Sequence, residues 1–367
     1  MRLMIPSCVA CLIAFTIPAA SLAQPNKKAA ITDAATAGPD FDLQGEYLGW
    51  LNASGRGSEP AGLQIVALGD GKFDAVQYRG GLPGNGWDRT TKAHFNGTSQ
   101  KGSLVLTGES GSFVIADRVA TAYGLDGREQ GRLRRVARRS PTIGLLPPES
   151  ATVLFGNGST DQLQGAKVSP DGLLMAGVLT KMPVQAFRMH LEFRTPYMPN
   201  ARGQARGNSG VYIQQRYEVQ ILDSFGLEGI ENECGGLYRQ QRPEQNMCLP
   251  PLAWQTYDIW FTPPLFDAEG KKTYNARLTV LHNGIPIHLH REVIAKTGGG
   301  KQESPEAFPI NLQDHGNPVA FRNIWIVPGM GDDYFEASQG LSFETSCAAG
   351  CGCDSGKRRG LFARRCR

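Results

Sequence analysis

Apolar and polar residues alternate along most of the chain with a period of two, which is typical of β-strands with one buried face. Between residues 41 and 139 the alternating runs are short and are separated by glycine, as in GEYLGWL, AGLQIVAL and GSFVIAD. Five or six short strands at this spacing predict a small antiparallel β module. Its residues form no evident catalytic constellation, which favours a packing or spacer role.

Residues 150–329 carry longer alternating runs. Four apolar residues alternate with four polar ones across residues 187–194, and residues 211–221 and 276–281 repeat the pattern. Strands with one apolar and one polar face predict two stacked antiparallel sheets, a jelly-roll β-sandwich. The 45 glycines and 23 prolines favour turn-rich β structure. The expected fold class is therefore all-β, with this sandwich following the smaller N-terminal antiparallel β module.

Both ends of the chain differ from these two regions. Residues 1–23 have a basic start, an apolar stretch and Ser21-Leu-Ala23 before Gln24, which predicts a signal peptide. The apolar stretch is shorter than the roughly 20 residues of a membrane-spanning helix, and no transmembrane anchor is expected. We therefore expect an exported protein that is periplasmic, secreted or at the cell surface. Residues 24–40 are interpreted as a linker, and residues 330–367 as a basic, cysteine-rich tail.

Six of the eight cysteines lie beyond the predicted signal peptide, and an even number in an oxidising compartment indicates disulfides. Cys234 and Cys248 are predicted to pair within one loop of the main domain. The other four cysteines lie in the tail, where a Cys-x-Cys spacing without nearby histidine does not match a zinc site. They are Cys347, Cys351, Cys353 and Cys366.

The charge of the chain does not indicate a nucleic-acid partner. A net charge of +4 is mild for 367 residues. Six arginines lie between residues 128 and 139, but no aromatic residues that would stack on bases are interleaved with them. This basic stretch, with Pro141 and Pro147-Pro148 after it, is interpreted as the boundary between the two β regions.

Several stretches of residues 150–329 resemble the 3-keto-disaccharide hydrolase domain family, formerly a domain of unknown function, and follow the family's order across about half of the chain. The resemblance implies a concanavalin A-like lectin and glucanase sandwich whose concave sheet holds carbohydrate, and enzymes that act on glycosides oxidised to a ketone at sugar carbon 3. The opening departs from the family pattern, because no tryptophan follows Leu154-Phe-Gly-Asn-Gly158. The matching stretches are HLEFRTPY (190–197), RGNSGVYIQQRYEVQILDS (206–224), NECGG (232–236), WQTYD (254–258) and LQDHGNPVAFRNI (312–324).

Within the second of these stretches, strand geometry places alternate polar side chains on one face of a sheet. Glu218 is the central candidate for catalysis. Asp223 lies five positions later, so it shares this face only if a bulge shifts the strand; otherwise it ends the strand by turn hydrogen bonding. The candidates for positioning a sugar are Asn208, Tyr212, Gln214 and Gln220.

The chemistry implied by the resemblance needs few groups. A ketone at carbon 3 acidifies the hydrogen on carbon 2, so that a base can remove it while the glycosidic oxygen leaves carbon 1. Glu218 or His315 is the candidate base. Arg322 or a divalent metal ion is the candidate for stabilising the enolate oxygen, although an ion pair across the sheet is the alternative for Arg322. No nucleotide-binding fingerprint is present, so a separate oxidoreductase would supply the 3-keto sugar.

Two other functions remain open at this point. An ordinary two-carboxylate glycoside hydrolase needs a second acid across the cleft, and Gln220 stands where sandwich glucanases keep one. A non-catalytic carbohydrate-binding or cell-envelope protein is favoured by the cysteine-rich tail and the additional β module. His282, His288 and His290 lie on a hairpin around Asn283-Gly284 and are expected to be exposed.

Overall fold

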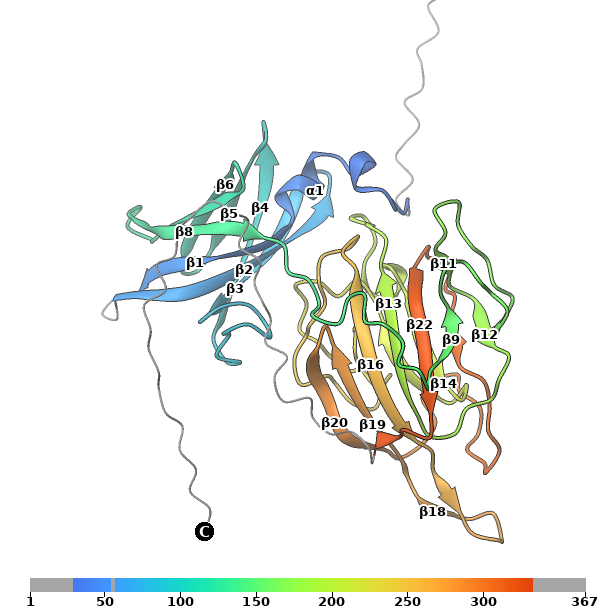
Figure 1. Ribbon diagram of the computed structural model, residues 1–367. Coiled ribbons are helices and arrows are strands. Elements are labelled where there is room, and N and C mark those ends of the chain that lie inside the picture. Colours follow the sequence, from blue (N-terminus) through green and yellow to red (C-terminus); the bar gives the residue numbers. More distant parts are fainter. Residues whose placement is uncertain (1–28, 54–56, 333–367) are drawn as a thin grey trace, which may run out of the picture.

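The computed structural model describes residues 29–53 and 57–332, which fold almost entirely into antiparallel sheets (Figure 1). The all-β prediction is therefore confirmed. The predicted signal peptide and most of the cysteine-rich tail, with Cys347, Cys351, Cys353 and Cys366, lie outside the described residues. Most of residues 29–43 fall in the predicted linker, and they include the 3-10 helix η1 (Ala34–Thr36) and the helix α1 (Pro39–Leu43). No described helix has the length and apolar character needed to cross a membrane.

The N-terminal β module is a closed eight-stranded barrel rather than five or six strands. Consecutive strands pair antiparallel, and β1 pairs with β8 to close it, with Gly49 opposite Leu133. A contiguous apolar core that includes Phe73, Phe95 and Phe113 fills its interior. The strands are β1 (Gly45–Ala53), β2 (Gly57–Gly69), β3 (Lys72–Arg79), β4 (Lys92–Gln100), β5 (Ser103–Gly108), β6 (Gly111–Ala116), β7 (Val119–Tyr123) and β8 (Glu129–Val136).

The C-terminal region contains two larger sheets. One has the order β10-β12-β21-β14-β15, and the other has the order β11-β22-β13-β16-β19-β20 with β9 beside β22. Their strands are β9 (Thr152–Phe155), β10 (Leu163–Gln164), β11 (Leu174–Met175), β12 (Val178–Thr180), β13 (Phe187–Arg194), β14 (Ser209–Ile213), β15 (Tyr217–Ile221), β16 (Gln255–Thr262), β19 (Ala276–His282), β20 (Ile285–Val293), β21 (Asn311–Leu312) and β22 (Ala320–Pro328). β17 (Leu265–Phe266) and β18 (Lys272–Tyr274) form a separate hairpin that projects at the bottom of Figure 1.

The two large sheets share one hydrophobic core. It combines apolar side chains of β14 and β15, such as Val211 and Val219, with those of β13 and β16, such as Leu191 and Ile259. Because both contributing sheets alternate apolar and polar residues, one face of each packs inward while the other can carry polar side chains. This leaves the outer face of β14 and β15 available for a site.

The segment after β8 leaves the barrel and crosses one face of the seven-stranded sheet (Figure 1). Thr142 donates a hydrogen bond of 2.9 Å to Asp258 on β16. The amide of Gly144 donates to the carboxylate of Glu192 at 2.6 Å, and the indole of Trp325 donates to the Leu145 carbonyl at 3.2 Å. At the start of this segment, the buried Arg138 guanidinium donates to Glu46 of β1 at 2.7 Å.

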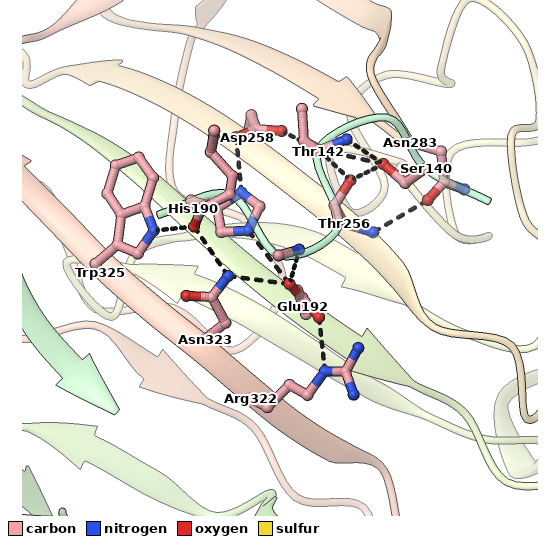
Figure 2. A network of polar contacts seen from close by, with 12 residues as sticks. Ser140, Thr142, His190, Glu192, Thr256, Asp258, Asn283, Arg322, Asn323 and Trp325 are labelled. Atoms are coloured by element: carbon pink, nitrogen blue, oxygen red, sulfur yellow. Dashed lines mark hydrogen bonds and ion pairs between the residues drawn. The ribbon is translucent and has the colours of Figure 1, made fainter. Parts of the chain in front are cut away.

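Beneath this segment lies a buried polar network centred on His190 (Figure 2). Its ring lies 2.8 Å from the Asp258 carboxylate and stacks on Trp325. Burial alone lowers the pKa of His190, but hydrogen bonds to Asp258 and Glu192 outweigh it and raise the pKa. Through Asp258 and Glu192, the network is joined to Thr142 and Gly144 of the crossing segment.

Candidate functional site

A hollow of about 700 Å³ lies on the polar side of β14 and β15, on the five-stranded sheet. Side chains from these two strands, from the loop around η2 (Gly203–Ala205), from residues 299–301 and from the end of β21 converge on it. Five of the predicted site residues line it, namely Asn208, Tyr212, Glu218, Gln220 and His315. The hollow is also lined by residues that were not among the predicted ones, namely Gln204, Gln215, Tyr238, Gly299, Lys301, Asn311 and Gln313.

Glu218 lies in the wall of this hollow with only 3% of its surface exposed. It is directly opposite Tyr212 in the pairing of β14 with β15, and the Tyr212 hydroxyl hydrogen-bonds its carboxylate. Burial raises the pKa of Glu218 to about 7, although the hydrogen bond from Tyr212 acts in the opposite direction. A carboxylate with a pKa near neutrality is suited to accept a proton from a carbon acid.

Gly210 provides the space for this carboxylate. A Cβ atom at position 210 would lie 2.5 Å from Oε1 of Glu218 and 3.1 Å from Oε1 of Gln313. Real Cβ atoms essentially never approach an oxygen at the first of these distances. The glycine therefore allows the Glu218 and Gln313 side chains to lie over the backbone of β14, beside each other.

Three amide side chains present acceptors without a protein partner. Oδ1 of Asn208, Oε1 of Gln220 and Oε1 of Gln313 are buried and accept no hydrogen bond among the described residues. The amide nitrogens of Asn208 and Gln220 both donate to Gln204, at 2.8 Å to its carbonyl and 3.0 Å to its Oε1 respectively. Gln204 thus fixes which end of each amide remains free. Unpaired buried acceptors are costly, and the hydroxyl groups of a ligand would satisfy them.

The rim of the hollow adds a cation, an aromatic ring and an imidazole. The Lys301 ammonium lies 4.9 Å from the centroid of the Phe308 ring. Tyr238 is partly exposed and packs against Gly298. His315 is exposed on the loop after β21. Together these groups offer a charge, a flat apolar surface and a titratable ring to one ligand.

Three predicted site residues lie elsewhere. Gln214 follows β14 in a left-handed turn conformation (φ 51°), which turns its buried amide toward the Val184 carbonyl, 2.7 Å away. Asp223 follows the end of β15 without a bulge, and its carboxylate accepts from Arg206 at 2.6 Å. The hollow therefore contains neither of these side chains.

Arg322 is also separated from Glu218, because it belongs to the other sheet. Its guanidinium donates to Glu192 at 2.6 Å and lies over the Trp254 ring, 4.0 Å from the centroid. The ion pair across the sheet, which was the alternative for this residue, is the arrangement observed. Arg322 is on the path of β22 in the seven-stranded sheet, whereas Glu218 is on β15 in the five-stranded sheet. Arg322 therefore does not line the hollow that contains Glu218.

The predicted disulfide is absent as well. Cys234 and Cys248 are free thiols, both fully buried. They hydrogen-bond each other, and Cys234 also lies 3.2 Å from the Tyr257 hydroxyl. His290 is exposed as expected, but His282 and His288 are buried. Burial lowers the pKa of these two residues, to about 3 and about 4 respectively. The described residues contain no group of three or more His, Cys, Asp or Glu side chains that could hold a metal ion.

Comparisons with known proteins find a family match in the C-terminal region. Residues 150–327 match the model of the 3-keto-alpha-glucoside-1,2-lyase-like domain family. A solved structure from Parabacteroides distasonis, provisionally classed as a glycosyl hydrolase, is 31% identical over 49% of this chain and 84% of that chain, with a TM-score of 0.45. A second structure of that description and organism is 18% identical over 50% and 98%, with a TM-score of 0.35. Trypanosoma rangeli sialidase in complex with sialic acid is 7% identical over 77% and 50%, with a TM-score of 0.29. None of the curated proteins gives a match.

Proposed function

Because the chain belongs, through residues 150–327, to the 3-keto-alpha-glucoside-1,2-lyase-like domain family, we propose that it cleaves 3-keto-glycosides by elimination followed by hydration. The observation that carries this proposal is the buried Glu218 carboxylate in a hollow that also contains three amide oxygens without a hydrogen-bond partner among the described residues. Sugar hydroxyl groups could donate to these oxygens. The packed pair of sheets is in keeping with the concanavalin A-like jelly roll that the family resemblance implies.

In the proposed reaction, Glu218 removes the proton from carbon 2 of the 3-keto sugar. The electron pair of that C–H bond moves into an enolate, with the negative charge on the oxygen of carbon 3. When the enolate collapses to the ketone, the double bond forms between carbons 1 and 2 and the bond from carbon 1 to the glycosidic oxygen breaks. The leaving alcohol takes up a proton at its oxygen, for which the exposed His315 at the rim is the donor. Water then adds across the double bond, so the net result is hydrolysis.

The remaining groups bind and orient the sugar. Lys301 is the cation on the rim of the hollow and takes the role first assigned to Arg322, namely stabilising negative charge on the oxygen of carbon 3. The free acceptors of Asn208, Gln220 and Gln313 receive sugar hydroxyls. Tyr212 holds the Glu218 carboxylate in place through its hydrogen bond.

The same geometry argues against an ordinary two-carboxylate glycoside hydrolase. Such an enzyme needs two carboxyl groups about 5 to 9.5 Å apart across the scissile bond. Among the residues that line the hollow, Glu218 is the single carboxylate. The nearest candidate in sequence, Asp223, is engaged by Arg206 and lines a different cavity.

The test is to incubate the full chain with 3-keto-trehalose, with and without a chelator, and to measure release of 3-keto-glucose. Glu218→Gln keeps the shape and the acceptor for Tyr212 but cannot take a proton, so turnover should fall by about 100-fold or more. Glu149→Gln, an exposed glutamate outside the hollow, is the matched control and should leave turnover unchanged. Equal rates for Glu218→Gln and the unaltered protein would remove Glu218 from the mechanism. Binding of the substrate without turnover would instead indicate a non-catalytic carbohydrate-binding protein.

The setting of this reaction is part of the same proposal. The signal peptide predicted for residues 1–23 would deliver the enzyme outside the cytoplasm, and a separate oxidoreductase would oxidise carbon 3 before the sugar reaches Glu218. A protease-protection measurement on cells that make the full chain would test export.

A further inference from the structure

Two additional cavities lie between the barrel and the sheets of the C-terminal region. One, of about 440 Å³, is lined by residues of β2, β3 and β4 in the barrel, by Arg202, Gly203 and Arg206, and by several residues between 223 and 233. The other, of about 370 Å³, is lined by residues 78–92 of the barrel and by residues 227–246. Leu227 and Glu228 line both cavities, so the two are neighbours along one track. We call this track the interface groove.

The interface groove begins next to the hollow that contains Glu218. Gly203 lines the groove, while the adjacent Gln204 lines the hollow. Likewise, Arg206 lines the groove, and Asn208, two residues later, lines the hollow. A single short segment around η2 therefore separates the two, and a ligand longer than one sugar ring can extend over it.

The lining of the interface groove has the side chains that carbohydrate recognition uses. Arg206 is buried, and its Nη2 has no hydrogen-bond partner among the described residues although its Nε pairs with Asp223. It can donate to a sugar oxygen. At the other end Trp87 is partly exposed and is held edge-on against Tyr78, with ring centroids 5.1 Å apart. A fixed indole ring presents a flat apolar surface for a sugar ring.

The groove is held open by contacts that join its two sides. The amide of Gly84 in the barrel donates to Gln245 at 3.0 Å, and Lys92 forms an ion pair with Glu228. Val66 of β2 belongs to the core of the C-terminal sheets. Because both walls are fixed in relation to each other, a ligand would not need to bring them together, which favours binding.

We propose that the interface groove binds further sugar units of the leaving group, so that the preferred substrate is an oligosaccharide with one terminal 3-keto sugar. This inference rests on the proposed function for the position of the keto sugar, whose carbon 1 carries the rest of the glycan. The barrel thereby supplies one wall of the substrate site. Specificity for chain length resides in Trp87 and its neighbours rather than in the hollow around Glu218.

The experiment compares disaccharides with tetrasaccharides that carry a ketone at carbon 3 of the non-reducing sugar, in an α-linked maltose series and a β-linked cellobiose series. In one of the series kcat/KM should be about 10-fold higher for the tetrasaccharide, which is the effect of one well-made additional contact. Trp87→Ala should remove this advantage and leave turnover of the disaccharide unchanged. Trp50→Ala is the matched control, because Trp50 is a barrel tryptophan, 59% exposed, that lines neither cavity.

Gln241→Ala provides a second variant in case Trp87→Ala does not fold, since its side chain lines the groove and only its backbone is bonded to Leu237. Equal kcat/KM for both lengths in both series would overturn the inference while leaving the proposed function intact. If no 3-keto substrate is cleaved, the proposed function fails, and calorimetry with unoxidised maltotetraose and cellotetraose decides the inference separately. Tighter binding of a tetrasaccharide than of its disaccharide, lost in Trp87→Ala, supports it, and equal binding overturns it.

Discussion

The Glu218 carboxylate should make the protein less stable than it could be at alkaline pH. Its pKa is about 7 in the folded protein because of burial, against an ordinary value of 4.5. Below pH 4.5 the group is protonated in both the folded and the unfolded chain, so it does not lower the free energy of unfolding. Above pH 7 it is ionised in both, and the folded chain must hold the charge in a buried position. The loss of stability therefore develops between pH 4.5 and pH 7.

The magnitude follows from the two pKa values. A rise from 4.5 to about 7 corresponds to about 3 kcal/mol of unfolding free energy, at about 1.36 kcal/mol for each pH unit. Glu218→Gln removes the charge and keeps an acceptor for Tyr212. We therefore expect the variant to be more stable than the unaltered protein by up to about 3 kcal/mol at pH 8.5 and equally stable at pH 4.

The assay is denaturation in urea followed by tryptophan fluorescence at both pH values. Glu192→Gln is a control of opposite sign. Although burial alone raises the pKa of Glu192, hydrogen bonds from His190, Asn323, Gly144 and Arg322 outweigh it and lower the pKa to about 2. Its ionised form stabilises the fold above pH 4.5 and loses this effect as the pH falls through 2, so Glu192→Gln should destabilise at pH 8.5. If Glu218→Gln is no more stable than the unaltered protein at pH 8.5, the buried-base argument is wrong.

Two other variants test the geometry of the site. Gly210→Ala introduces a Cβ atom 2.5 Å from Oε1 of Glu218 and should displace the carboxylate. We therefore expect kcat on 3-keto-trehalose to fall by about 10-fold or more. An unchanged kcat would show that the carboxylate does not act from this position. Arg322→Gln should leave kcat unchanged, because Arg322 pairs with Glu192 on the other sheet, and should lower the melting temperature instead; a large loss of kcat with normal thermal stability would restore Arg322 to the site.

The alternation of residues along single strands was enough to predict much of the site. Tyr212, Glu218 and Gln220 line one hollow because side chains two positions apart point to the same face of a sheet. The same rule failed for Gln214, because β14 ends at Ile213 and a left-handed turn follows, so the alternation no longer applies. Alternation also could not predict the direction of the Asp223 side chain, because this residue lies beyond the end of β15 at Ile221.

Features that depend on contacts between distant segments could not be obtained from the sequence. The barrel is closed by pairing of its first strand, β1, with its last strand, β8. No local sequence pattern predicts a pairing between strands so far apart in the chain. The separation of Arg322 from Glu218 could not be predicted either, because alternation along a strand does not tell which sheet the strand joins. Lys301 lies in a loop between β20 and β21, where period-two reasoning has no application. Gln313 could have been noticed, because it lies two residues before His315 in a stretch that resembles the family.

The segment that crosses one face of the seven-stranded sheet has a consequence for any attempt to separate the two halves. Family resemblance alone would place the start of an independent C-terminal fragment at residue 150. A fragment cut there would lack Thr142 and Gly144, and the carboxylates of Asp258 and Glu192 would lose donors that cover them. A C-terminal fragment that folds independently must therefore begin before Ser140. The structural domain thus starts about ten residues before the family match, which begins at residue 150.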